Sequence, residues 1–169
     1  SQAFPQAEKL VVIVQGIPGL GKTTVGNLAS DQLGEESVTL EQDTYWQYKT
    51  RAKAKCLEQM ELYLADPRLS YVWILRNNSQ VNQYRDFVRL ARDYGWKVLV
   101  LVPRELAYPN AAREILLRVC RITVTRRTGH ISFDSLPTEK RIAIVNSFNK
   151  TFRPATISES QADSISTIN

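Results

Sequence analysis

Residues 10 to 25 read Leu-Val-Val-Ile-Val-Gln-Gly-Ile-Pro-Gly-Leu-Gly-Lys-Thr-Thr-Val, and they contain the strongest structural signal in the chain. The apolar run 10–14 is typical of a buried strand, and residues 16–23 fit the P-loop pattern G-x-x-x-x-G-K-[ST]. Apolar residues at helical spacing come next, so a strand, a glycine loop and a helix follow in the order that the motif needs. The sequence therefore predicts a binding site for a nucleoside triphosphate.

The residue types of this loop suit phosphate binding. Glycine lacks the Cβ that would hold a phosphate away from the backbone, so the loop N–H groups and the next helix N-terminus can form an anion site. Lys22 is expected to reach the β and γ phosphates, and the Thr23 hydroxyl to ligate Mg²⁺. The predicted nucleotide-binding residues are Gly16, Ile17, Pro18, Gly19, Leu20, Gly21, Lys22, Thr23 and Thr24. A tight strand-to-helix turn with chance glycines is the alternative, and the flanking pattern speaks against it.

The composition is that of an ordinary globular chain. Its 169 residues suit one domain, with 43% hydrophobic and 23% charged residues. No apolar run approaches the roughly 20 residues of a membrane span, and the N-terminus has no signal-peptide layout. We therefore expect an intracellular protein of the cytoplasm or nucleus, neither secreted nor bound to a membrane. Cys56 and Cys120 lack metal-ligand spacing and are expected to be buried thiols outside any disulfide.

Strand and helix patterns alternate along the rest of the chain. Further strands are expected over residues 38–41, 71–75 and 96–102, and helices over 47–65, 79–94, 109–122 and 135–150. This alternation predicts an α/β fold with a parallel sheet of four to five strands flanked by helices. We expect one domain over residues 1–169, with a core at about 9–154. The Ser-rich stretch 155–169 is expected to be a loosely held tail.

The helix expected over 109–122 carries both apolar and basic residues. Its expected inner stripe consists of Ala112, Ile115, Leu116, Val119 and Ile122. Arg113, Arg118 and Arg121 would then project on the solvent side, where Arg121 could contact the phosphates of an acceptor. The net charge of +5 is compatible with nucleic acid or with phosphate-rich small molecules and decides between neither.

Residues that follow the strands are the candidates for chemistry, because ligands of such sheets bind at the carboxyl ends of the strands. Asp43 follows the second strand and could accept the proton of an attacking hydroxyl, although an aspartate that caps a turn is the alternative. Arg126 and Arg127 lie in a polar, glycine-containing segment that predicts a small lid, from which an arginine could stabilise a transferring phosphoryl group. A solvated charge pair is the alternative for the two arginines.

Three further segments are distinctive: Arg76-Asn77-Asn78, then Arg127 with His130-x-Ser132, then Phe133-Asp-Ser-Leu-x-x-Glu-Lys-Arg-Ile-Ala-Ile-Val-Asn-Ser-Phe-Asn-Lys-Thr-Phe-Arg-Pro154. They resemble the central kinase domain of fungal tRNA ligases, a polynucleotide 5′-hydroxyl kinase of the P-loop phosphotransferase class. With the P-loop, the likeness covers nearly the whole chain.

The resemblance implies an adenylate-kinase-like P-loop core that transfers the γ-phosphate of GTP or ATP, with Mg²⁺, to an RNA 5′-OH end in RNA repair or tRNA splicing. It matches Lys22, Asp43, Arg126 and Arg127 to catalytic roles and Thr23 to the metal. It also implies substrate binding by Arg76, Asn77, Asn78 and His130. An RNA ligase and a phosphodiesterase, fused to the chain or working with it, are the implied partners.

One residue departs from the family pattern. Leu75 stands directly before Arg76-Asn77-Asn78, where the family usually has an aspartate. If that carboxylate helps to organise Mg²⁺, the metal must rely here on Thr23, Asp43 and water. Two other functions therefore stay open: a small-molecule kinase for a nucleoside or sugar, and a P-loop binding domain without catalysis.

Overall fold

The structure, a computed structural model, describes residues 8–21, 31–107, 111–128 and 133–168. The strands are β1 (Leu10–Val14), β2 (Ser37–Glu41), β3 (Tyr71–Leu75), β4 (Lys97–Pro103) and β5 (Ser164–Ile168). The α-helices are α2 (Ala52–Ala65), α3 (Val81–Asp93), α4 (Arg104–Ala107), α5 (Ala111–Arg126), α6 (Thr138–Thr151) and α7 (Ile157–Ser160). Two 3₁₀ helices, η1 (Gly34–Glu36) and η2 (Gln42–Arg51), flank β2. Among the helices so described, none is long and apolar enough to cross a membrane.

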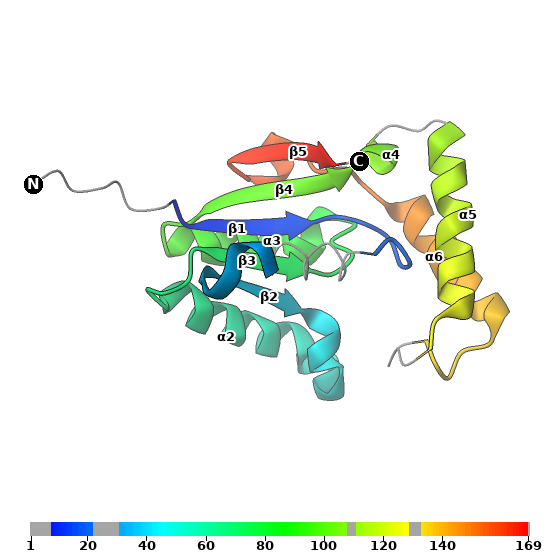
Figure 1. Cartoon of the computed structure of the whole chain (residues 1–169), viewed down its shortest axis with the longest axis horizontal. Helices are drawn as coiled ribbons and strands as arrows, with labels where there is room; N and C mark the ends of the chain where they lie inside the picture. The colour runs from blue at the N-terminus through cyan, green and yellow to red at the C-terminus, as the bar shows by residue number, and fades with distance from the viewer. Residues whose placement is uncertain (1–7, 22–30, 108–110, 129–132, 169) are drawn as a thin grey trace, which may run out of the picture.

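The five strands form one sheet in the order β2-β3-β1-β4-β5, and every pair is parallel. The predicted parallel α/β architecture is therefore confirmed. Continuous apolar runs such as 71–75 are typical of strands that are covered on both faces. Because all strands point the same way, their carboxyl ends share one edge of the sheet, which faces the α5–α6 hairpin (Figure 1).

The main core lies between the sheet and the helices α2 and α3. Alternate residues of the central strands point into it, as do Tyr84, Phe87, Val88 and Ala91 of α3. On α2 the inward residues are Ala52, Cys56, Met60 and Leu64, four residues apart. Two other apolar residues of this helix, Ala54 and Leu62, are exposed. Cys56 and Cys120 are buried outside any disulfide, as predicted.

The C-terminal stretch is part of the fold, which corrects the expectation of a loosely held tail. β5 pairs with β4 along its length, and α7 precedes it. Asp163 fixes the start of this strand, because its carboxylate accepts a hydrogen bond of 2.8 Å from the Val98 amide and its own amide donates to the Val98 carbonyl. Backbone pairing of an edge strand needs few apolar side chains, so a Ser-rich sequence can supply it.

The α5–α6 hairpin reverses the expected orientation of its first helix. The side chains of α5 that lie buried are Leu117, Cys120 and Val124, whereas Ile115, Val119 and Ile122 are at least half exposed. Of the inner stripe predicted from the sequence, Leu116 packs against the core, but the other four residues are exposed, so the predicted side of the helix was wrong. Its physical cause lies on α6, which offers polar partners to the arginine-bearing side of α5.

Candidate active site

The carboxyl edge of the sheet brings together three loops that are far apart in the sequence. The register aligns Val14 at the end of β1 with Leu75 of β3 and with Leu101 of β4, and aligns Leu75 with Glu41 of β2. The loop that begins at Gly16 therefore follows the strand next to β3, whose end leads to Arg76, and the segment that begins at Gln42 lies one strand further along the same edge. This arrangement is the topological site at which parallel sheets bind ligands.

The described part of the phosphate loop contains two glycines in the left-handed region, Gly19 and Gly21, each with a φ of 86°. Side chains rarely adopt this conformation, so the turn itself requires glycine. At Gly19 a Cβ would also lie 2.7 Å from the carbonyl oxygen of Cys120 in α5. The loop is thus packed directly against the hairpin. Ile17 is fully buried, so only its backbone could face a phosphate.

A buried amide, Gln15, fastens the start of this loop. Its Nε2 donates to the carbonyl oxygens of Asn78 (2.8 Å) and Arg153 (3.0 Å), and its Oε1 accepts from the Ala155 amide (2.8 Å). The amide of Gly16 donates to the carbonyl of Asn77. Sequence reasoning missed Gln15, although one polar residue ending an apolar run before a P-loop was a usable signal. Gln15 joins the loop to β3 and to the segment after α6.

Asn78 lies within this junction and is fully buried. Its Nδ2 donates to the carbonyl oxygens of Val14, Ile74 and Arg76 at 3.1–3.3 Å, and its φ is 46°. Its Oδ1 has no hydrogen-bond partner among the residues that the structure describes. In this arrangement the Asn78 side chain holds two strand ends together. A contact between Asn78 and a substrate, as the sequence predicted, would require this side chain to leave its position.

The side chain of Arg76 lies against helix α3. Its Nη1 donates to the Gln83 carbonyl at 3.0 Å, and its guanidinium lies 6.0 Å from the centre of the Phe87 ring. It also faces Cys56: burial raises the pKa of that thiol to about 11, and the charge of Arg76 acts in the opposite direction. Arg76 and Asn77 are both half-buried at the predicted edge of the sheet.

The arginines of α5 divide between its two sides. Arg121 Nε donates to the Asn146 side chain of α6 at 2.8 Å. About two turns earlier on α5, Arg113 donates to the side chain and the backbone carbonyl of Asn149. Arg118 is exposed. Two of the three arginines predicted to face solvent therefore tie the hairpin together.

Arg141 of α6 binds the backbone at the end of α5, where the predicted lid begins. The sequence pattern did not single out this residue. The guanidinium of Arg141 is buried and donates to the carbonyl oxygens of Val124 (3.0 Å), Arg127 (2.7 Å) and Leu136 (3.0 Å). Arg126 is the exposed last residue of α5, and Arg127 follows it, half-buried. The signal for Arg141 was its place on the apolar spacing of α6, four residues before Val145.

Several predicted residues cannot be placed from the described ranges. Lys22, Thr23, Thr24 and His130 lie outside them. Of Asp43 the structure gives the backbone, which belongs to η2 directly after β2. Within the described ranges, no three His, Cys, Asp or Glu side chains gather as a metal site. A magnesium ion that bridges nucleotide phosphates needs only one or two protein oxygens.

The sheet does bring one carboxylate next to Leu75. Glu41 is the register partner of Leu75 on β2, and paired residues of neighbouring strands point to the same face. That face carries the small cluster of Val12, Val14 and Leu75. Glu41 is half-buried at its carboxyl edge. An acidic residue is therefore present one strand away from the position where the resembling family has its aspartate.

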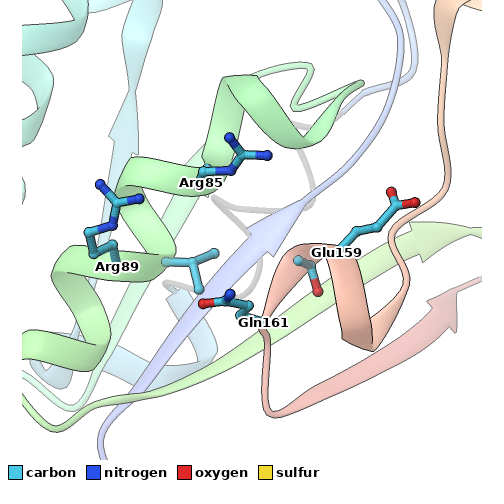
Figure 2. Close-up of a pocket in the computed structure, with 6 residues that line it drawn as sticks. Arg85, Arg89, Glu159 and Gln161 are labelled. Atoms are coloured by element: carbon cyan, nitrogen blue, oxygen red, sulfur yellow. The ribbon is translucent and has the colours of Figure 1, made fainter.

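A separate hollow of about 270 Å³ lies between α3 and α7. Figure 2 shows the guanidinium groups of Arg85 and Arg89 on one side of it and the carboxylate of Glu159 on the other. None of its lining residues belongs to the predicted site.

Comparisons with known proteins bear on the fold. Neither a protein family model nor a curated protein sequence matches the chain. Among solved structures, a fungal RNA kinase is 19% identical, with a TM-score of 0.65 over 97% of this chain and 76% of that one. A gluconokinase from Sinorhizobium meliloti 1021 is 17% identical, with a TM-score of 0.51 over 95% and 81%. A chain of a Pnkp1/Rnl/Hen1 complex is 16% identical, with a TM-score of 0.51 over 80% and 45%.

These similarities agree with an α/β fold built on a parallel sheet flanked by helices. At such low identity they establish the fold and leave the substrate open. The chain has the α/β fold of P-loop kinases.

Proposed function

We propose that the chain is an RNA 5′-hydroxyl kinase, which transfers the γ-phosphate of GTP or ATP to the 5′-OH end of an RNA. Support comes from the P-loop kinase fold, from the sequence resemblance to the kinase domain of fungal tRNA ligases, and from the structural similarity to a fungal RNA kinase. The fold and the loop favour phosphoryl transfer, and a further observation favours a polynucleotide as its acceptor.

That observation is the distribution of charge. Residues 111–151 contain eight Lys and Arg against three Asp and Glu, a net of +5, which equals the net charge of the whole chain. The other residues are therefore balanced, and the entire excess of positive charge lies on the α5–α6 hairpin. This hairpin packs against the phosphate loop at Gly19. A polynucleotide presents a row of phosphates to such a surface, whereas a sugar or nucleoside presents none.

The proposed roles follow from the residue types. Lys22 and the loop amides would hold the donor phosphates, and Thr23 would hold Mg²⁺, which neutralises charge on the phosphates when bound. Asp43 would orient the 5′-OH and take its proton as the oxygen bonds to the γ-phosphorus. The bond from phosphorus to the β–γ bridging oxygen breaks, and its electron pair leaves with the nucleoside diphosphate. Arg126 or Arg127 would stabilise the transferring group from the lid.

In the same proposal, Glu41 would help to hold Mg²⁺. With Leu75 unable to offer an oxygen, Glu41 is the carboxylate on the same face one strand away. Glu41→Gln should reduce the extra thermal stability that Mg²⁺ gives to the protein with bound ADP. Glu36→Gln, an exposed carboxylate before β2, is the matched control and should leave that gain unchanged. An equal gain in both variants would remove Glu41 from the metal site.

The proposed setting is RNA repair or tRNA splicing inside the cell, in the cytoplasm or nucleus. A kinase that supplies 5′-phosphates fits beside a phosphodiesterase that prepares RNA ends and a ligase that seals them. The structural similarity to a chain of the Pnkp1/Rnl/Hen1 RNA repair complex supports this setting. That similarity covers 48% of the other chain.

One assay separates the candidate functions. Labelled ATP and GTP are offered with a short 5′-OH RNA, the same RNA with a 5′-phosphate, the corresponding DNA, nucleosides and gluconate. We expect label on the 5′-OH RNA, either alone or together with the 5′-OH DNA. The Michaelis constant for RNA should rise with salt, by about 0.7 logarithmic units for each phosphate contact and each tenfold increase in salt concentration. Gluconate is included because the gluconokinase similarity supports a small-molecule kinase. Label on a small molecule, without salt dependence, would reject the polynucleotide proposal.

Two variants test the chemistry in this assay. Lys22→Ala should lower turnover by at least about a hundredfold, the scale of one lost electrostatic stabiliser. Asp43→Asn should lower turnover by about 10²–10⁴-fold with little change in nucleotide affinity, the range of a general base. Asp93→Asn, an exposed aspartate at the end of α3, is the matched control. A wild-type protein that binds nucleotide and phosphorylates nothing would favour the binding domain without catalysis.

A further inference from the structure

The outer face of α5 carries an apolar stripe that no described element covers. Ile115 is 63% exposed, Val119 51% and Ile122 50%. These side chains point away from Leu117, Cys120 and Val124, the buried side of the same helix. Figure 1 shows α5 at the end of the molecule, with α6 on its sheet side. Single exposed aliphatic residues are common, but three in register on one helix mark an interaction surface.

The spacing of this stripe is that of a helix-pairing seam. Ala112 is also exposed and continues the series, so that residues 112, 115, 119 and 122 alternate steps of three, four and three. This is the a and d pattern of two heptads, by which one helix packs along another. Val and Ile at these positions fill the spaces between the side chains of a partner helix. The stripe therefore has the form of one half of a helix pair.

Charge decides which helix would fit. Arg118 and Arg126 are exposed on this face, and the hairpin as a whole carries the +5 net charge. A second copy would bring a like-charged hairpin against the first, which opposes pairing of two identical faces. A helix with Asp or Glu beside its apolar seam would place opposite charges against the arginines. Bases of single-stranded RNA stack on aromatic side chains, and this face has none.

We propose that the outer face of α5, formed by Ala112, Ile115, Val119 and Ile122 with Arg118 and Arg126, docks an amphipathic helix of another protein whose apolar seam is flanked by acidic residues. The packed side of α5 belongs to the hairpin and the phosphate loop. The outer side belongs to the partner. Arg126 is shared with the proposed lid, but the apolar seam of Ile115, Val119 and Ile122 has no role in the proposed catalysis.

The probe is a synthetic helix about three heptads long, with Leu at the a and d positions and Glu at the flanking e and g positions. A Lys version and a scrambled Glu version serve as controls. Binding to the purified full chain is measured by fluorescence anisotropy at physiological salt. We expect the Glu helix to bind at least about tenfold more tightly than either control, and to weaken as salt increases.

The protein variant removes the seam without touching the core. Replacing Ile115, Val119 and Ile122 together by Ser should weaken binding of the Glu helix by at least about tenfold, because the buried apolar contacts are lost. Leu62→Ser is the matched control, since Leu62 is 66% exposed on α2, and it should leave binding unchanged. Circular dichroism confirms that both variants keep the fold. RNA phosphorylation by the triple variant should remain that of the wild type.

Three results would overturn the proposal. Equal binding of all three peptides would show that the stripe has no preference for an acidic helix. A dimer in sedimentation experiments that the triple variant loses would assign the face to a second copy. Competition between single-stranded RNA and the Glu helix, with RNA binding also lost in the triple variant, would assign the face to the acceptor.

Discussion

Helices α3 and α5 carry similar mixtures of aliphatic residues and arginines, yet the apolar stripe that the sequence pattern predicts faces the core only on α3. On α3 the apolar stripe that includes Phe87 faces the core, and Arg85 and Arg89 are exposed. On α5 the stripe of Ile115, Val119 and Ile122 faces outward, while Arg113 and Arg121 face α6. The periodicity is helical in both cases, but it identifies the buried side only for α3.

The difference comes from what lies beneath each helix. α3 rests on strands whose inward side chains are apolar, so only an apolar stripe can pack there without leaving polar groups unpaired. α5 rests on α6, where Asn146 and Asn149 offer oxygens to guanidinium groups. Arg113 and Arg121 can therefore lie beside the buried stripe of Leu117, Cys120 and Val124, while the stripe of Ile115, Val119 and Ile122 stays exposed. Partner chemistry, rather than the pattern of one helix, decides which face turns inward.

The largest effect that tests this contrast is expected on α3. Phe87→Ala removes a fully buried ring from the core and should lower the free energy of unfolding by about 3–5 kcal/mol. Ile115→Ala on α5 removes an exposed side chain and should change it by no more than about 0.5 kcal/mol. Urea unfolding of the two variants measures both values. Similar losses would show that the α5 stripe is covered in solution.

The next effect concerns the polar packing of the hairpin. Arg141→Leu removes a buried guanidinium and leaves the carbonyl oxygens of Val124, Arg127 and Leu136 without that donor. The expected loss is about 2–3 kcal/mol, with faster hydrogen exchange at the end of α5 than in α3. Arg118→Leu, an exposed arginine, is the control and should stay within about 0.5 kcal/mol. A uniform rise in hydrogen exchange across α3 and α5 would contradict a local role of Arg141 at the end of α5.

The sequence predicted the elements whose signals are local. The run 71–75 is observed as β3 without change, and helix α3 ends at Asp93, one residue before the predicted end and two before the left-handed Gly95. β5 was missed because its pairing with β4 uses backbone groups, which leave little trace in side-chain pattern. The helix predicted over 109–122 extends to Arg126, since Arg141 binds its last carbonyls from another element. Contacts between distant segments decided each of these differences.

For the candidate site too, the sequence predicted the features with local signals and missed those that depend on distant contacts. The P-loop pattern located the glycine loop and the edge of the sheet, because backbone conformation at Gly19 and Gly21 follows from residue type. The burial of Asn78 could not be foreseen, since it depends on Gln15 and on the segment at Arg153 from the far end of the chain. The roles of Lys22, Asp43 and the lid arginines stay predictions, to be decided by the kinase assay.

A smaller effect is expected for one ion–amide contact of the hairpin. A double-mutant cycle of Arg121→Ala and Asn146→Ala should give a coupling energy of about 1 kcal/mol, as for a hydrogen bond to a charged group near the surface. A cycle of Arg118→Ala with Asn146→Ala is the control and should give a coupling near zero. Equal coupling in both cycles would mean that general charge, and not this contact, stabilises the hairpin.

The smallest expected effect is a change in the free energy of unfolding with pH, which comes from the core beneath α2. Burial raises the pKa of Cys56, between α2 and the sheet, from 9.0 to about 11. Below pH 9 the thiol keeps its proton in both the folded and the unfolded chain, so it contributes no pH dependence. From pH 9 towards 11 the unfolded chain loses this proton while the folded chain retains it, which favours unfolding. Stability should therefore fall as pH rises, by less than about 1 kcal/mol between pH 8 and 9.5.

Cys56→Ala identifies the source of that decline. The variant starts from a lower stability because it leaves a small cavity, but the part of its slope between pH 8 and 9.5 that comes from Cys56 should disappear. The comparison is therefore between slopes and not between absolute stabilities. Unfolding in urea at four or five pH values gives both slopes. If the variant keeps the full slope, the proton is lost from another group, and the thiol of Cys56 is less buried than the packing of α2 against the sheet implies.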